Sequence, residues 1–201
     1  MSLPAETKTR YTIAEYLQQE RDSEEKHEYM DGQIVSMAGG TRRHSLISAN
    51  IVRALGNRLE DKPCRVYESN LRIRIPRKVL YTYPDATVIC GKDEADPDDT
   101  SGETLTNPTL LVEVLSPSTK RLDRIVKFAR YRTIETFKEY VLVSQDEPEL
   151  QSLYRQPDGT WLLTPVIGME AVAQLRSLQI ELPLREVFAK VEFPPEPAAT
   201  P

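Results

Sequence analysis

The six residues 110–115 form the sequence LLVEVL, and they limit the possible folds more than any other segment. A continuous apolar run of this length is typical of a strand at the centre of a sheet, where both faces are buried. The single acid in the run, Glu113, conflicts with burial, because an isolated carboxylate loses its hydration in a protein interior. Three explanations are open: Glu113 pairs with an arginine or lysine, the strand lies at a sheet edge, or Glu113 binds a metal ion.

A second acid, Asp85, is suited to the same place, because it follows Pro84 just before the β-prone run 86–90. Pro-Asp is also a common turn pair, so the dipeptide alone is weak evidence of a functional site. If the strands that carry Asp85 and Glu113 are neighbours, the two carboxylates lie together. Carboxylates and water are the ligands that Mg²⁺ or Mn²⁺ prefers. The sequence therefore predicts a magnesium or manganese site at Asp85 and Glu113.

Lys127 is the candidate for the further cation that a phosphodiester-cleaving site needs beside its metal ion. It lies on the helix expected over residues 119–135, directly after the Glu113 strand. Asp123 stands four residues earlier, and an exposed Asp-Lys pair at this spacing contributes only ~0.3–0.5 kcal/mol. We favour that surface pair for Asp123, and both interpretations stay open for Lys127.

Hydrophobic periodicity predicts a mixed α/β or α+β fold, with a central sheet and helices packed on it. A capping box of Thr12 and Glu15 begins the first helix, and Asp31-Gly32 is a hairpin turn signal. In the clearest helix, within residues 43–61, the apolar residues recur every four positions: Ile47, Ile51, Leu55 and Leu59. Strands are expected over 71–75, 81–90, 110–115 and 139–145, and a hairpin over 150–167.

Three further expectations concern exposure. Arg72 and Arg74 alternate with apolar residues, which predicts a half-buried strand whose basic face is either solvated or in contact with phosphate. The acidic, apolar-poor segment 91–108 is expected to be a surface loop. The helix over 119–135 is expected to turn four apolar residues toward a core: Leu122, Ile125, Val126 and Ala129.

Length and composition indicate one domain. The 201 residues suit a single core, expected over 11–190, with a flexible N-terminus at 1–10 and a Pro-rich tail at 191–201. The net charge of -5 counts against a simple nucleic-acid coat protein. No apolar run is long enough to span a membrane, and no secretory signal is evident. We therefore expect a cytoplasmic protein in which Cys64 and Cys90 are reduced thiols.

The motifs together resemble a known family. The segments YPDATVIC, NPTLLVEVLSPSTKRLDRIVKFARYR, EYVLVS and the upstream EYMDGQIVSMAGGTRRHSLISANIVRAL are similar to those of the Uma-type restriction-endonuclease family. The resemblance covers roughly Thr12 to Val187. It implies the PD-(D/E)XK nuclease fold, a restriction-endonuclease-like mixed sheet flanked by helices, with Mg²⁺ held by an aspartate and a glutamate.

Carried onto this chain, the resemblance gives Asp85 and Glu113 the roles of the motif acids, and the carbonyl of Val114 that of an extra metal ligand. The wider superfamily has a lysine two residues after the glutamate, where this chain has Leu115. The resemblance suggests that Lys127 replaces that lysine from the next helix. The remaining two residues with family counterparts are Glu28, an N-terminal glutamate, and His44, an accessory histidine. From the residues alone, Glu28 is more simply a solvated strand acid, and His44 a helix-terminal or core hydrogen-bonding residue.

The resulting hypothesis is a Mg²⁺- or Mn²⁺-dependent endonuclease that acts on double-stranded DNA. Leu115 and the acidic charge favour one alternative, a catalytically inactive nuclease-fold protein used for binding or assembly. A nucleotide phosphohydrolase could use the same carboxylates. The resemblance also implies a homodimer, because two sites related by a two-fold axis suit the cleavage of two strands.

Overall fold

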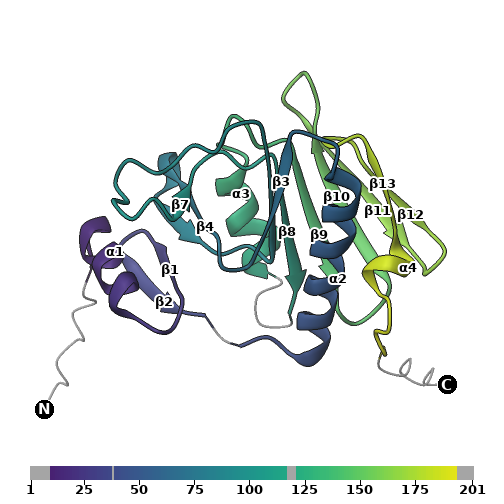
Figure 1. Ribbon diagram of the computed structural model, residues 1–201, viewed down its shortest axis with the longest axis horizontal. Coiled ribbons are helices and arrows are strands. Elements are labelled where there is room, and N and C mark those ends of the chain that lie inside the picture. The colour runs from purple at the N-terminus through teal and green to yellow at the C-terminus, as the bar shows by residue number, and fades with distance from the viewer. Residues whose placement is uncertain (1–9, 38, 117–120, 194–201) are drawn as a thin grey trace, which may run out of the picture.

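The computed structural model describes residues 10–37, 39–116 and 121–193 (Figure 1). Its two main sheets share a hydrophobic core. The expected N-terminal extension and Pro-rich tail fall largely outside these ranges. The first sheet has five strands in the order β2-β1-β5-β4-β7: β1 (His27–Met30), β2 (Gln33–Ser36), β4 (Arg72–Ile75), β5 (Leu80–Thr82) and β7 (Thr104–Leu105). The second sheet has six strands in the order β11-β10-β9-β8-β6-β3: β3 (Cys64–Glu68), β6 (Ala86–Cys90), β8 (Leu110–Leu115), β9 (Glu139–Ser144), β10 (Glu149–Arg155) and β11 (Trp161–Ile167).

Smaller elements complete the described chain. Figure 1 shows α1 with the β1–β2 hairpin at one end of the molecule, and the β12–β13 pair with α4 at the other. The helices are α1 (Ile13–Asp22), α2 (Arg42–Leu59), α3 (Phe128–Tyr131), α4 (Leu184–Val187), the 3₁₀ turn η1 (Pro76–Lys78) and the π-helical η2 (Leu122–Lys127). The remaining strands are β12 (Val172–Leu175) and β13 (Ile180–Pro183). The mixed fold of sheets flanked by helices agrees with the prediction from the sequence.

Strand β8 is a central strand, as its apolar sequence predicts. It pairs parallel with β9 and antiparallel with β6. Leu110, Val112 and Val114 enter a core that lies under α2, α4 and the β12–β13 pair. Leu111 and Leu115 enter a second core, which lies between the two large sheets and against α3. Glu113 alternates with Val112 and Val114, so it faces the second side, where α3 and the five-stranded sheet approach.

Local sequence signals explain several elements. Thr12 and Glu15 form the predicted capping box of α1. The turn between β1 and β2 has positive φ angles at Asp31 and Gly32, as a tight Asp-Gly hairpin turn requires. The stripe of α2 is buried as predicted at all four positions: Ile47, Ile51, Leu55 and Leu59. This helix packs on the six-stranded sheet and lies in front of it in Figure 1.

The predicted basic face on β4 is wrong. Arg72 is buried and forms an ion pair of 2.7 Å with Asp99, and Arg74 pairs with Asp96. Both aspartates lie in the segment 91–108, which was expected to be an exposed loop, and both are buried. Most of the segment is nevertheless an exposed loop, as predicted, apart from these acids and the end that contains β7. The prediction for β4 failed because its arginines and acids of a distant segment neutralise each other, which local periodicity cannot reveal.

The helix after β8 is shorter than predicted and turns its other side inward. Asp123, Lys127 and Tyr131 are buried, whereas Ile125 is 60% exposed and Ala129 is also exposed. The predicted apolar contact face is therefore wrong at Ile125 and Ala129, whereas Leu122 and Val126 are half-buried. The predicted Asp123–Lys127 pair is present, but it is buried and not on the surface. The π-helical hydrogen bonding of η2 widens the turn that carries these residues, a feature often found at functional sites.

Cys64 and Cys90 form a disulfide, which corrects the expectation of reduced thiols. They are directly paired residues of the antiparallel strands β3 and β6, so the register places their side chains together. A spacing of 26 residues gave no sign of this, because the pairing depends on which strands become neighbours. Within the described residues, no helix has the length and apolar character needed to cross a membrane.

Candidate functional site

All six residues predicted from the sequence to form the site line one cavity of about 470 Å³ between the two large sheets: Glu28, His44, Asp85, Glu113, Val114 and Lys127. They come from β1, α2, the residue before β6, β8 and η2. Only β8 and η2 are consecutive in the chain, and the other elements are far from each other in the sequence. The cavity therefore exists only because the sheets and helices pack as they do.

Asp85 and Glu113 are neighbours because of the β6–β8 register. Ala86 pairs with Val112 in this antiparallel ladder, so the next position places Asp85 opposite Glu113. One carboxylate oxygen of Asp85 accepts a hydrogen bond of 2.7 Å from the main-chain N–H of Val114. The carbonyl of Val114 remains the predicted further oxygen ligand. The register thus brings together the two acids that the sequence analysis paired.

Lys127 lies among three buried carboxylates. Its Nζ is 2.9 Å from Glu28, 3.2 Å from Glu113 and 3.3 Å from Asp123. Position 115 is a leucine in this chain, and the positive charge beside Glu113 comes instead from Lys127 of η2. Leu115 itself packs in the core between the sheets. The contact also shows that one of the simpler explanations of Glu113, an ion pair with a lysine, is present in the fold.

Glu28 is buried, so the simpler prediction of a solvated strand acid is wrong. It accepts a hydrogen bond from the hydroxyl of Thr82, which lies on the neighbouring strand β5. Since β1 belongs to the five-stranded sheet, Glu28 brings a carboxylate from that sheet to the acids of the six-stranded sheet. The site is therefore built across the interface of the two sheets.

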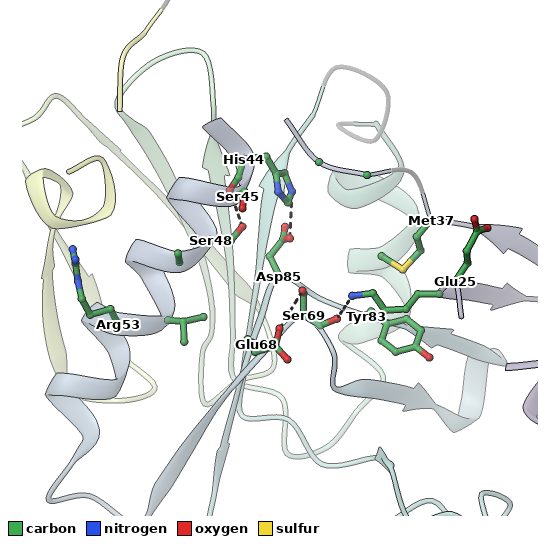
Figure 2. A pocket seen from close by; sticks show the side chains of 15 residues that line it. Glu25, Met37, His44, Ser45, Ser48, Arg53, Glu68, Ser69, Tyr83 and Asp85 are labelled. Carbon is green, nitrogen blue, oxygen red and sulfur yellow. Dashed lines mark hydrogen bonds and ion pairs between the residues drawn. The ribbon is translucent and has the colours of Figure 1, made fainter. Parts of the chain in front are cut away.

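His44 lies in the first turn of α2 and points toward the site, where its Nε2 is 3.2 Å from a carboxylate oxygen of Asp85 (Figure 2). Gly40 packs against the imidazole so closely that a Cβ at this position would lie 2.8 Å from Nδ1. A side chain at position 40 would therefore displace the ring. The hydrogen bond to Asp85 raises the pKa of His44 above its ordinary value, although burial of the ring opposes this.

The electrostatic balance of the cavity is negative. Burial raises the pKa of Glu113 well above its ordinary value, Lys127 lowers it, and the neighbouring carboxylates raise it further. Burial by itself lowers the pKa of Lys127, but the surrounding carboxylates outweigh it and hold this pKa well above its ordinary value. Lys127 is therefore charged, and one ammonium with His44 faces four carboxylates: Glu28, Asp85, Glu113 and Asp123.

The donor set suits a hard divalent cation. Carboxylate and carbonyl oxygens are the preferred ligands of Mg²⁺ and Mn²⁺, and the excess of buried negative charge is what a divalent ion would offset. In the part of the chain that the structure describes, no three His, Cys, Asp or Glu side chains already form a metal-binding group. The oxygens of Asp85 and Glu113 instead accept hydrogen bonds from protein groups, so ion binding would exchange some of these contacts.

Three residues at the site were not assigned to it from the sequence: Asp123, which was expected at the surface, Tyr131 and Gln145. Tyr131 donates a hydrogen bond of 2.9 Å to the Glu113 oxygen that Lys127 also contacts. Gln145 is buried just after β9. Its side-chain amide donates a hydrogen bond to the carbonyl of Leu115 and accepts one from the hydroxyl of Thr41, the residue before α2. The four-residue spacing of Lys127 and Tyr131 was a usable signal for the tyrosine. No local signal marks Gln145, whose partners lie far away in the sequence.

Comparison with known proteins decides the family. Residues 13–188 match the model of the Uma2 family, which is described as "Putative restriction endonuclease". The chain belongs to the Uma2 family. This confirms the resemblance inferred from the sequence motifs, and membership supports a nuclease-like role.

Two relatives and one solved structure are also similar to this chain. "Uncharacterized protein slr1290" of Synechocystis sp. (strain ATCC 27184 / PCC 6803 / Kazusa) is 37% identical over 89% of this chain and 92% of its own length. "Uncharacterized protein sll1609" of the same organism is 35% identical over 84% of this chain and 94% of its own length. A crystal structure of "a putative nuclease belonging to DUF820 from Anabaena variabilis ATCC 29413" has a TM-score of 0.63 at 20% identity, covering 86% of this chain and 96% of that one. At that identity the likeness establishes the fold.

Proposed function

We propose that this protein is an endonuclease that hydrolyses phosphodiester bonds in DNA with Mg²⁺ or Mn²⁺ as cofactor. The observation that carries the proposal is that Asp85, Glu113 and Lys127 line one cavity, with the acids on adjacent strands and the ammonium beside Glu113. Two acids can hold a divalent ion that assists phosphodiester hydrolysis, and a lysine can stabilise the charge that develops on the phosphate. Membership of the Uma2 family supports this chemistry.

Each residue has a proposed role. Asp85, Glu113 and the carbonyl of Val114 would hold the metal ion. The bound ion would supply Lewis-acid stabilisation of the charge that develops on the phosphate, and would promote ionisation of water. Lys127 would place its ammonium beside the attacking water and the scissile phosphate. Glu28 holds that ammonium at 2.9 Å and would help to order the water.

His44 acts through Asp85 in this proposal. Its contact with the carboxylate fixes the orientation of the acid, and α2 supplies the rigid support for the ring. We therefore regard His44 as a positioning residue. Its raised pKa means that it carries charge over a wider pH range than a free histidine and adds to the positive charge that Lys127 provides.

The test is cleavage of supercoiled plasmid by the purified protein with Mg²⁺ or Mn²⁺. We expect nicked and linear products from the parent and none in EDTA. Asp85→Asn and Glu113→Gln should each lower the rate at least ~100-fold, because each removes a charge that holds the ion. Glu24→Gln, at an exposed acid after α1, is the matched control and should cleave like the parent. If both site variants cleave at the rate of the control, this mechanism is wrong.

A non-catalytic role in binding or assembly is the second candidate. The specific observation in its favour is that Lys127 already neutralises part of the charge of Glu28, Glu113 and Asp123. Calorimetric titration with Mn²⁺ separates the two candidates. Binding that is lost in Asp85→Asn favours the enzyme, whereas no binding up to millimolar Mn²⁺ favours the binding module.

We also propose that the substrate is double-stranded DNA and that the protein acts as a homodimer, because two symmetry-related sites can cut both strands. Light scattering tests the second statement. A mass of twice the 22.9 kDa chain is expected, and the mass of a single chain would remove the proposal of a dimer.

A further inference from the structure

A second cavity, of about 830 Å³, adjoins the candidate metal site along α2. We call it the α2 groove and define it by six of its lining residues: Lys26, Met37, Ser45, Ser48, Ala49 and Ser69. It is continuous with the site, because six residues line both cavities: Met37, Gly39, Gly40, His44, Tyr83 and Asp85. A molecule whose phosphate lies at Asp85 therefore has room to extend into the groove.

Figure 2 shows how the walls of the groove are formed. His44, Ser45 and Ser48 come from α2 on one side, and Met37, Glu25 and Tyr83 lie on the other. The wall on α2 runs from His44 to Arg53, a rise of ~14 Å for nine residues. The volume lies within the roughly 300–1,000 Å³ of sites for drug-sized ligands, and a nucleotide is a molecule of that size.

The chemistry of the lining suits a base and sugar better than a row of phosphates. The ammonium of Lys26 donates to the carbonyl of Ser69 and to the side-chain oxygen of Asn70. The guanidinium of Arg53 donates to Asn50 on the same helix. The carboxylates of Glu25 and Glu68 offset these two cations in the lining. A surface that binds a phosphate backbone is instead strongly basic.

The groove also offers the mixture of groups that contacts bases. Met37, Ala49 and Val52 supply apolar surface, and the hydroxyls of Ser45 and Ser69 can donate and accept hydrogen bonds. Tyr83 forms a fixed wall, because its hydroxyl donates to Glu20 and accepts from Arg72. A base can enter such a pocket only from a single strand or by rotating out of a duplex, which requires the base to unpair and unstack.

We infer that the α2 groove binds one unpaired nucleotide next to the scissile phosphate. This inference rests on the proposed nuclease function for the position of that phosphate. It adds that the proposed double-stranded substrate unpairs one nucleotide at the cleavage position when it binds. Mismatched and single-stranded DNA are therefore bound more tightly than a perfect duplex of the same sequence.

The test uses variants of the full chain and fluorescence anisotropy with three labelled DNAs: a single strand, the perfect duplex and the duplex with one central mismatch. Binding is measured with Ca²⁺, an oxygen-ligated ion whose looser coordination differs from the octahedral geometry of Mg²⁺. Ala49 is exposed on the groove side of α2, so Ala49→Trp would fill the groove. Asn57→Trp, at an exposed position of the same helix outside the groove lining, is the matched control.

We expect the parent to bind the single strand and the mismatched duplex at least fivefold more tightly than the perfect duplex. Ala49→Trp should raise the Kd for the single strand at least tenfold, and Asn57→Trp should change it less than twofold. Ala49→Glu provides a second variant that blocks the groove by charge, and thermal unfolding confirms that all variants are folded. Equal binding by the parent and both Ala49 variants, or a parent preference for the perfect duplex, overturns the inference.

Failure of the inference and failure of the proposed function give different results. If the parent cleaves plasmid but both Ala49 variants bind DNA as it does, the groove inference fails and the nuclease remains. If the parent binds single-stranded DNA but cleaves no DNA, and both Ala49 variants lose this binding, the groove binds nucleotides and the nuclease proposal fails.

Discussion

Two helices contact the six-stranded sheet from opposite sides, and they bury opposite kinds of residue. Helix α2 buries Ile47, Ile51 and Leu55, which follow one another at four-residue intervals. The η2–α3 helix buries Asp123, Lys127 and Tyr131 at the same interval, and it leaves Ile125 60% exposed. The spacing is the same, but only the first helix follows hydrophobicity.

The difference reflects what each helix faces. Helix α2 packs on the apolar side of β8, where Val112 and Val114 point. The η2–α3 helix packs on the side that carries Glu113, so its inward residues must supply charge and hydrogen bonds for a buried carboxylate. An amphipathic pattern therefore predicts the buried side of a helix that packs on a core, and fails for a helix that completes a polar site.

The strongest test of this comparison removes the buried cation of the second helix. Lys127→Met leaves three carboxylates without their ammonium, so the free energy of unfolding should fall by ~3–5 kcal/mol in urea at neutral pH without metal. Mn²⁺ should then stabilise the variant more than the parent, because the ion becomes the main cation in the cavity.

Arg132→Met is the control for Lys127→Met, since it removes an exposed cation from the residue after α3. Its effect should stay within ~0.5 kcal/mol. A loss below ~1 kcal/mol for Lys127→Met would show that the carboxylates are satisfied without the lysine, and the comparison between the two helices would fail.

A smaller effect is expected at the next inward residue. Tyr131→Phe keeps the ring in the core and removes only the hydroxyl that donates to Glu113. Hydrogen bonds to charged groups contribute ~1.5–3 kcal/mol, so the free energy of unfolding should fall by that amount. Tyr11→Phe, at an exposed tyrosine, serves as the control and should leave stability unchanged. Equal urea midpoints for the two variants would contradict a supporting role for Tyr131.

The smallest effect is expected on the outer side of the same helix. Ile125→Ala should change the free energy of unfolding by less than ~0.5 kcal/mol, because the side chain is mostly in water. The matched change on α2, Ile51→Ala, removes a fully buried side chain and should cost ~2–5 kcal/mol. Similar losses at both positions, measured by thermal or urea unfolding, would mean that Ile125 is covered in solution.

Much of the fold was predictable because its signals are local. The capping box of Thr12 and Glu15, the Asp31-Gly32 turn, the α2 stripe and the central strand β8 depend on residues near one another in sequence. The pairing of Asp85 with Glu113 was also predicted, although it needed the assumption that β6 and β8 are neighbours. The family resemblance identified Glu28 and His44, which the residues alone did not favour as site members.

The sequence by itself determined most of the elements, the candidate acid pair and the likeness to a nuclease family, since each follows from short-range patterns and recognisable motifs. Only the tertiary structure decided that Arg72 pairs with Asp99, that Cys64 meets Cys90, and that Lys127 lies among three carboxylates. The physical reason is the same in each case. A buried charge or thiol is placed by its partner, and the partner is chosen by strand register and sheet packing, which bring together residues far apart in the chain.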